Sequence, residues 1–268
     1  MAGEAGLRVS RRRLLKLAGG ASAWVAMAPR ALAAAPVPFV SEFRMYHEVS
    51  YAAFKSELLG LLDAGAQPLS IETIVGALNG EVAIPPGLRT FHITWDDARL
   101  SQYTDGWPAI RDVQRERGVF VPVTGFLITK FDHLPLAVQD VPPDTPCYHE
   151  DGNLPTNHRF MTKAQAIELI QHGIHAANHT VNHADLPALA SGAMQGEIAL
   201  AEQHIQALWD QAGVLRPVKV FAYPYGRFNA DIIAVLQGLG YDAAFSTIGS
   251  TRHSAAKRWT LGRVGFGG

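Results

Sequence analysis

Strand-like and helix-like segments alternate along the chain from residue 43 to residue 266, and this alternation limits the possible folds more than any other feature. Short apolar runs predict strands at 43–46, 90–95, 119–128, 174–177, 218–223, 242–246 and 260–266. Amphipathic stretches with capping signals predict helices at 52–64, 104–117, 162–173, 192–212 and 229–239. Repeated alternation of this kind implies a parallel sheet. The sequence therefore predicts an α/β fold, a distorted (β/α)7-type barrel in a single domain.

The pattern of the first 33 residues predicts an export signal that is not part of the barrel. Residues 10–16 are Ser-Arg-Arg-Arg-Leu-Leu-Lys, and a short apolar stretch and the small residues Ala31-Leu32-Ala33 follow. This order is typical of a twin-arginine (Tat) signal peptide cleaved after Ala33. The apolar stretch is shorter than the ~20 residues of a membrane-spanning helix. We therefore expect residues 34–268 to be a catalytic domain that passes through the Tat translocon to the periplasm or beyond, with no membrane span of its own.

Charge and cysteine content exclude several classes of partner and site. Removal of residues 1–33 leaves 17 basic residues against 23 acidic ones, a formal charge of −6. A mildly acidic surface argues against nucleic acid as a partner. The single cysteine, Cys147, excludes an intramolecular disulfide and a cysteine metal cage. It lies in a proline-rich stretch at about 130–160, which is predicted to be a long loop insertion.

Residues able to bind a metal follow two of the predicted strands. Asp96 and Asp97 come at the end of the strand at 90–95, whereas His179 and His183 come just after a later strand. The carboxyl ends of parallel strands meet at one edge of a sheet, where ligand-binding residues gather. Histidines four residues apart can also bind one ion together. Two carboxylates and two imidazoles at one edge therefore predict a catalytic divalent-metal site.

These segments resemble the motifs of the polysaccharide deacetylase family, which is also called the NodB-homology or carbohydrate esterase 4 family. Thr94-Trp95-Asp96-Asp97-Ala98 is similar to its Thr-Phe-Asp-Asp-Gly motif. His179-Thr180-Val181-Asn182-His183 is similar to His-Ser/Thr-x-x-His, and Ala222-Tyr223-Pro224-Tyr225-Gly226 to Arg-x-Pro-Tyr-Gly. Met45-Tyr46-His47 resembles the opening Met-Tyr-His strand of secreted members.

The resemblance assigns roles to the site residues. It implies that Asp97, His179 and His183 bind one divalent metal ion, for which we expect Zn²⁺, with Co²⁺, Ni²⁺ or Mn²⁺ as alternatives. It implies that Asp96 is the general base and that the backbone N–H of Tyr225 stabilises the oxyanion. The residues expected to line the substrate groove are Tyr223, Pro224, Trp95 and His47.

Three departures from the family pattern lead to further expectations. Ala98 replaces a glycine, so the loop must either absorb the strain of a left-handed residue or adopt another conformation. Ala222 stands where the family has an arginine, which predicts that the pKa of Asp96 is less depressed than usual. The family's terminal Leu-x-His motif, which provides the general acid, has no clear counterpart. His253 is the nearest candidate acid, and His47 is the second.

The predicted activity is metal-dependent hydrolysis of N-acetyl groups on an aminosugar polysaccharide or oligosaccharide. Two alternatives within this family remain open, an O-acetyl esterase on an exported glycan and a carbohydrate-binding homologue that has lost turnover. Two histidines and one carboxylate also form the site of non-haem iron oxygenases. The second aspartate and the strand–helix alternation disfavour that class. The sequence does not discriminate among possible glycans.

Overall fold

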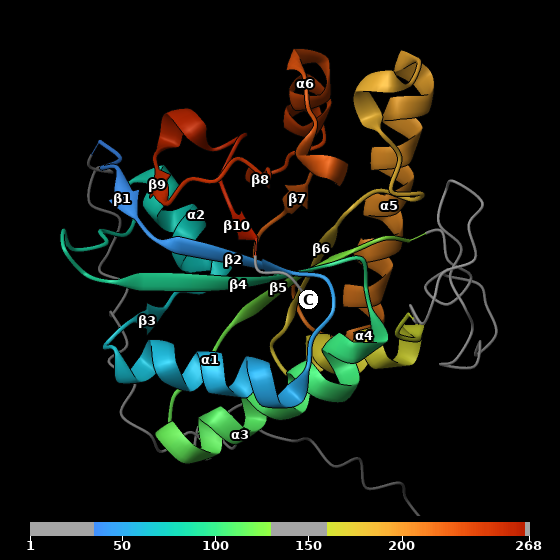
Figure 1. The fold of residues 1–268 in the computed structure, drawn as a ribbon. Coiled ribbons are helices and arrows are strands. Elements are labelled where there is room, and N and C mark those ends of the chain that lie inside the picture. The colour runs from blue at the N-terminus through green and yellow to red at the C-terminus, as the bar shows by residue number, and fades with distance from the viewer. Residues whose placement is uncertain (1–34, 130–159, 266–268) are drawn as a thin grey trace, which may run out of the picture. The chain divides into compact units, whose positions relative to one another are not determined.

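The computed structural model describes residues 35–129 and 160–265 and contains a curled, parallel sheet (Figure 1). The strands follow the order β10-β2-β4-β5-β6-β7-β8, and β3 also pairs with β4. Their bounds are β2 (Glu42–Tyr46), β3 (Gln67–Pro68), β4 (Thr90–Asp96), β5 (Val123–Leu127), β6 (His175–Asn178), β7 (Val220–Ala222), β8 (Ala243–Phe245) and β10 (Val264–Gly265). The predicted signal peptide at 1–33 and nearly all of the predicted loop at 130–160 lie outside the described residues.

The segment before β10 connects the two edges of this sheet. An isolated parallel bridge joins Phe245 of β8 to Leu261. The Leu261 N–H donates to the Ala244 carbonyl at 2.9 Å, and the Leu261 carbonyl accepts from the Ser246 N–H at 2.8 Å. Three residues later β10 pairs in parallel with β2. The sheet therefore curls round toward itself, and the predicted α/β fold with a distorted barrel of seven strands is confirmed.

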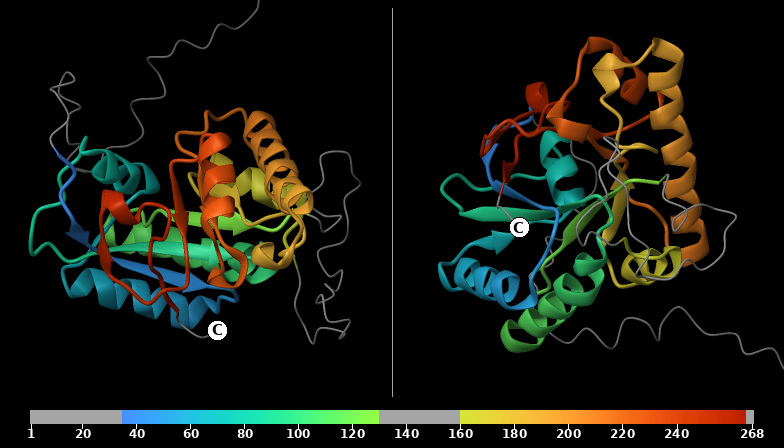
Figure 2. Two further views of the ribbon diagram at one scale, coloured as in Figure 1. Left: turned by 90° about the horizontal axis from the view of Figure 1, so that it is seen from above. Right: turned by 45° about the vertical axis from the view of Figure 1, so that its right-hand side comes forward.

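Six α-helices accompany the sheet in the described part of the chain. They are α1 (Tyr51–Asp63), α2 (Ile71–Asn79), α3 (Trp107–Arg117), α4 (Lys163–Gln171), α5 (Ser191–Ala212) and α6 (Ala230–Gly238). Figures 1 and 2 show α1 and α3 side by side along one part of the sheet and α5 and α6 beside β6 to β8. Inside the curl, Phe245 contacts Phe43 and Phe126, with ring centroids 5.5 and 5.3 Å apart. The interior is thus a packed core, and no helix in the described ranges is long and apolar enough to cross a membrane.

Local capping signals explain where the helices begin and end. The predicted capping box at α4 is present, since Thr162 Oγ1 accepts from the Gln165 N–H at 3.2 Å and Gln165 Oε1 from the Thr162 N–H at 2.7 Å. Helix α2 was not predicted from the sequence, although Ser70 caps its first turn and Gly80 ends it in the left-handed conformation. The short antiparallel pair of β1 (Phe39–Val40) and β9 (Arg252–His253) was not predicted either.

Two buried histidines support the core far from the carboxyl edge of the sheet. His92 Nδ1 bonds to the Leu69 carbonyl at 2.8 Å, and its Nε2 bonds to Thr124 Oγ1 at 3.0 Å. His253 Nε2 bonds to the Ser41 carbonyl at 3.0 Å, and its ring stacks on Phe43 with centroids 3.9 Å apart. Burial lowers the pKa of each imidazole to about 4.

These histidines make folding stability dependent on pH. A depressed folded-state pKa means that the unfolded chain binds protons first, so stability is complete above the ordinary value of about 6.5 and is lost as the pH falls toward 4. One pKa unit corresponds to about 1.4 kcal/mol, so each histidine removes up to about 3 kcal/mol across this range. Urea unfolding from pH 7 to pH 4 measures the effect. His253→Gln should flatten the profile. An unchanged slope in His253→Gln would contradict the prediction.

Candidate metal and catalytic site

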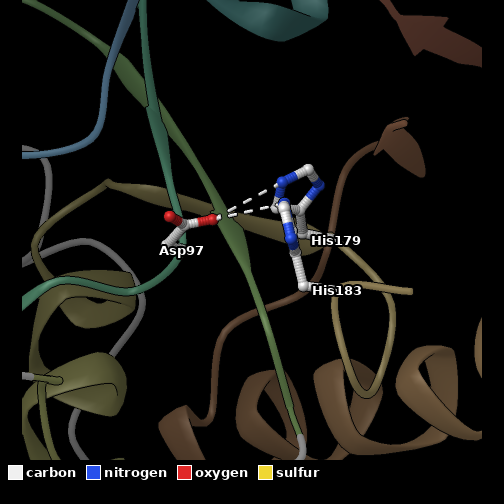
Figure 3. Close-up of side chains that lie close together, drawn as sticks. All are labelled: Asp97, His179 and His183. Atoms are coloured by element: carbon white, nitrogen blue, oxygen red, sulfur yellow. Dashed lines mark ion pairs between the residues drawn. The ribbon is translucent and has the colours of Figure 1, made fainter. Parts of the chain in front are cut away.

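Three side chains that could hold a metal ion meet at the carboxyl edge of the sheet (Figure 3). Asp97 follows the last residue of β4, and His179 follows the last residue of β6. Asp97 Oδ1 lies 3.6 Å from His179 Nε2 and 3.8 Å from His183 Nε2. The three ligand atoms all lie within 4.8 Å of one another. The structure thus brings together the triad proposed from the sequence.

Neighbouring groups orient two of these ligands toward a common point. Asp97 Oδ2 accepts a hydrogen bond from Arg99 Nη2 at 2.9 Å, whereas the buried Oδ1 has no hydrogen-bond partner among the residues that the structure describes. His179 Nδ1 lies 2.8 Å from the Ala222 carbonyl, which can only accept, so Nδ1 carries the proton. The Nε2 lone pair therefore faces the site. An orphaned carboxylate oxygen beside two imidazole nitrogens fits a divalent ion such as zinc.

The protonation states of the triad also suit a metal. Burial lowers the pKa of His179 below its ordinary value and that of His183 to about 4, so both imidazoles are neutral at pH 7. Burial alone would raise the pKa of Asp97, but the Arg99 guanidinium 2.9 Å from its Oδ2 opposes burial and the pKa is lowered. Metal ligands must be deprotonated, and all three are.

Non-glycine residues with a left-handed backbone are concentrated at this edge. Among the described residues, every non-glycine residue with a positive φ belongs to one of the three motif segments: Asp97 (74°), Ala98 (59°), Thr180 (70°), His183 (56°) and Tyr225 (58°). Ala98 thus adopts the left-handed conformation, so the loop absorbs the strain as the first of the two expectations stated, and Ala98 is fully buried. Such residues cost about 1–3 kcal/mol each and persist only where surrounding contacts hold them.

The expectation that Asp96 lacks a cationic partner is wrong. Arg263, from the segment that closes the barrel, places Nη1 2.6 Å from Asp96 Oδ1 and Nε 3.2 Å from the Ser246 carbonyl. Both side chains of the pair are buried. Burial would raise the pKa of Asp96, but the buried Arg263 guanidinium outweighs it, so the pKa is lowered. A cation that the sequence lacks at Ala222 is thus supplied by Arg263, which directly precedes β10.

His253 is not at the site, which corrects its prediction as the general acid. It is buried and stacks on Phe43, and Phe43 pairs with His92 of β4. His92 lies four residues before Asp96 on that strand. Four strand residues span about 13 Å. His47 lies at the site instead, because it directly follows β2 and is within electrostatic range of both Asp96 and Asp97. It is also exposed.

Three of the four residues expected to line the substrate groove are buried, and their prediction is corrected. Trp95 is fully buried in the apolar cluster that contains residues of α1 and α3. Tyr223 is fully buried with its hydroxyl on the Trp259 carbonyl, 2.9 Å away, and Pro224 is buried as well. Tyr223 packs in an apolar cluster with residues of α5 and α6. The exposed aromatic residue is Tyr225, whose ring lies 4.5 Å from that of His183.

Sequence reasoning missed two functional arginines. Arg99 is buried beside Asp97, and Arg263 is buried beside Asp96. A usable signal existed for Arg263, since it is the one charged residue in the predicted strand at 260–266. A charged residue in a buried strand needs a partner of opposite charge.

Comparison with known proteins agrees with this geometry. The sequence profile of the family described as polysaccharide deacetylase matches residues 84–244. YxkH of Bacillus subtilis, which is named as a polysaccharide deacetylase, is 23% identical over 211 residues, 76% of this chain and 63% of its own length. The chain therefore spans somewhat less than two thirds of that relative.

Two solved structures share the fold. The Streptococcus pyogenes deacetylase PplD, in complex with acetate, superposes with a TM-score of 0.66 at 22% identity, covering 86% of this chain and 93% of PplD. IcaB from Ammonifex degensii superposes with a TM-score of 0.61 at 18% identity, covering 85% of this chain and 91% of IcaB. With the matched profile covering more than half of its sequence, and with an aspartate–histidine–histidine site at the expected edge of the barrel, this chain belongs to the polysaccharide deacetylase family.

Proposed function

We propose that this protein is an exported, zinc-dependent hydrolase that removes N-acetyl groups from an aminosugar polysaccharide. The observation that carries the proposal is the pairing of a convergent Asp97–His179–His183 triad with a second carboxylate, Asp96, that a separate arginine holds. A bound zinc ion would supply Lewis acidity, polarising the acetyl carbonyl and making a water molecule more acidic. Membership of a deacetylase family supports the same reaction.

Asp96 is suited to act as the general base. Its Oδ1 is held by Arg263, while its Oδ2 lies 3.8 Å from His179 Nε2 and so faces the ligand cluster. Its lowered pKa keeps it ionised at neutral pH, ready to accept a proton from the attacking water. Because Arg263 fixes one oxygen, the carboxylate cannot rotate away from the triad without losing that bond.

The remaining roles fall to residues at the rim. The turn at Pro224–Gly226 lies beside His183, and we assign the Tyr225 backbone N–H to the developing oxyanion. His47 is assigned to protonate the departing amine, in place of His253. Gln102 Nε2 joins the backbones of the candidate acid and the candidate base, since it donates to the His47 carbonyl at 2.8 Å and to the Asp96 carbonyl at 2.6 Å.

The loss-of-turnover alternative is weakened by the contacts of the site. That alternative depended on Ala98, on Ala222 and on the missing terminal histidine. Ala98 adopts the left-handed conformation that the motif needs, and Arg263 provides the cation absent at Ala222. His47 provides an imidazole near Asp96.

Acetate release tests the proposed activity. Zinc-loaded protein lacking residues 1–33 should release acetate from N-acetylated aminosugar polymers, and a chelator should abolish the release until zinc is restored. O-Acetylated glycans in a parallel assay separate the esterase from the amidase. Binding of a glycan with no acetate release from any polymer would overturn the proposal in favour of the binding protein. Export is tested by fusing residues 1–33 to a folded reporter, with Arg11, Arg12 and Arg13 changed to lysine as the control.

A further inference from the structure

Helix α5 contacts the histidine-bearing loop directly through Glu197. Its Oε2 accepts the backbone N–H of Asn182 at 2.8 Å, and its Oε1 accepts from the Asn182 side-chain amide. Asn182 immediately precedes His183, which has a positive φ of 56°. A carboxylate that accepts two bonds from one residue fixes both its backbone and its side chain. The left-handed conformation of His183 is therefore anchored from α5.

A second contact from α5 reaches the other end of the loop. The Tyr241 hydroxyl donates to Glu202 Oε2 at 2.8 Å and accepts from Asn178 Nδ2 at 2.6 Å. Asn178 Nδ2 also donates to the Ile198 carbonyl of α5 at 3.0 Å. Asn178 Oδ1 in turn accepts from the Thr180 N–H at 2.7 Å, and Thr180 has a φ of 70°. The chain of bonds thus passes on both sides of His179.

Glu202 is a buried charge that the surrounding residues neutralise. It is 8% exposed, and its Oε1 lies 2.7 Å from Arg216 Nη1 and 3.2 Å from Lys219 Nζ. Its other oxygen is therefore a charged, fixed acceptor for the Tyr241 hydroxyl, and charge-assisted bonds of this kind are stronger than neutral ones. Neither Glu197 nor Glu202 touches the metal ligands themselves.

We propose that Glu197 and Glu202 are positioning residues that hold the His179–His183 loop in its strained form, so that both imidazoles are preorganised before the metal binds. The proposal rests on the metal site of the proposed function. Without these contacts Thr180 and His183 would relax toward ordinary backbone conformations, because the left-handed region disfavours residues with a Cβ. The two Nε2 atoms would then no longer meet at Asp97. Metal affinity should fall even though all three ligands are retained.

The test compares zinc affinity, measured by competition with a chromophoric chelator, across matched variants. Glu197→Ala should weaken zinc binding about 10- to 100-fold, the range typical of groups that orient metal ligands. Glu197→Gln keeps an oxygen that can accept the Asn182 N–H and should recover most of the affinity. Gln195→Ala is the matched control, since Gln195 is exposed on the same helix and, within the described part of the chain, its side chain bonds to Ser191 of that helix.

Tyr241→Phe tests the second contact while leaving the ion pairs of Glu202 in place. It should weaken zinc binding several-fold, whereas Tyr51→Phe, which removes a hydroxyl bond to Asp112 of α3, should not. Hydrogen exchange of metal-free protein provides a readout independent of turnover: amides at 179–183 should exchange faster in Glu197→Ala and Tyr241→Phe. Thermal unfolding identifies any variant that is globally unfolded, and Tyr241→Phe and Glu197→Gln serve if Glu197→Ala does not fold.

The outcomes separate this proposal from the proposed function. Wild-type zinc affinity and wild-type loop exchange in folded Glu197→Ala and Tyr241→Phe would overturn the positioning role, as would lowered melting temperatures with unchanged affinity. Wild-type protein that binds zinc no better than His179→Ala would overturn the metal site itself. Protein that binds zinc, shows the expected losses and yet releases no acetate would support positioning and refute the deacetylase activity.

Discussion

Asp96→Asn is expected to lower kcat for acetate release by about 10³-fold, within the range for loss of a general base. The asparagine oxygen can still accept from Arg263, so the protein should fold, with some loss of stability because the buried guanidinium has lost its counter-charge. An amide, however, cannot take a proton from water. Zinc affinity should stay near that of the wild type, because Asp96 is the base and not a ligand. Steady-state kinetics with the zinc-loaded protein measures kcat, and KM should change little.

Asp97→Asn is the matched comparison for this experiment. It changes the adjacent carboxylate, which contributes the orphaned Oδ1, and should lower zinc affinity strongly. Asp96→Asn is thus expected to lower turnover and keep zinc affinity, whereas Asp97→Asn is expected to lower zinc affinity. Equal loss of zinc binding in both variants, or full turnover in Asp96→Asn, would contradict the assigned roles.

Arg263→Met is expected to destabilise the zinc-free protein by about 3–5 kcal/mol, because it leaves the Asp96 carboxylate buried without its counterion. Urea unfolding measures this loss. Turnover of the folded fraction should also fall, since Asp96 Oδ1 is no longer held. Arg263→Lys keeps the charge and should lose less stability and less turnover than Arg263→Met. Some loss should remain, because a lysine cannot reproduce the bond to Ser246 together with that to Asp96.

Two controls show whether the effect of Arg263 comes from its pairing with Asp96. Arg227→Met breaks an exposed ion pair with Asp185 and should cost no more than about 1 kcal/mol. The double variant Asp96→Asn/Arg263→Met should be more stable than the sum of the single changes implies, as expected for residues in direct contact. Additive losses in the double variant would mean that the pair is not coupled.

Most of the fold and the metal triad could be predicted because their signals are local. Capping residues and glycines set the helix ends, as at Thr162 and Gly118. The four-residue spacing of His179 and His183, and their place after a strand, already indicated one ligand cluster. Ser70 and Gly80 offered equally local signals for α2 that went unused.

What could not be predicted depends on which distant strands become neighbours. Arg263 meets Asp96 only because the segment around Leu261 lies between β8 and β2 in the curled sheet. Whether Trp95 and Tyr223 face a groove or a helix likewise depends on which side of the strand the helices cover. His253 matched a chemical requirement, but β9 pairs with β1, away from the carboxyl edge of the sheet.

The barrel closure by Arg263 has a consequence for synthesis of the protein. Asp96 and Arg263 are 167 residues apart, which corresponds to roughly 10–30 s of translation at about 5–20 residues per second. During that interval Arg99 is already present beside Asp97, but the counterion of Asp96 has not yet been made. Asp96 cannot be buried together with its counterion until residue 263 has left the ribosome. The site around Asp96 should therefore be among the last parts of the protein to fold.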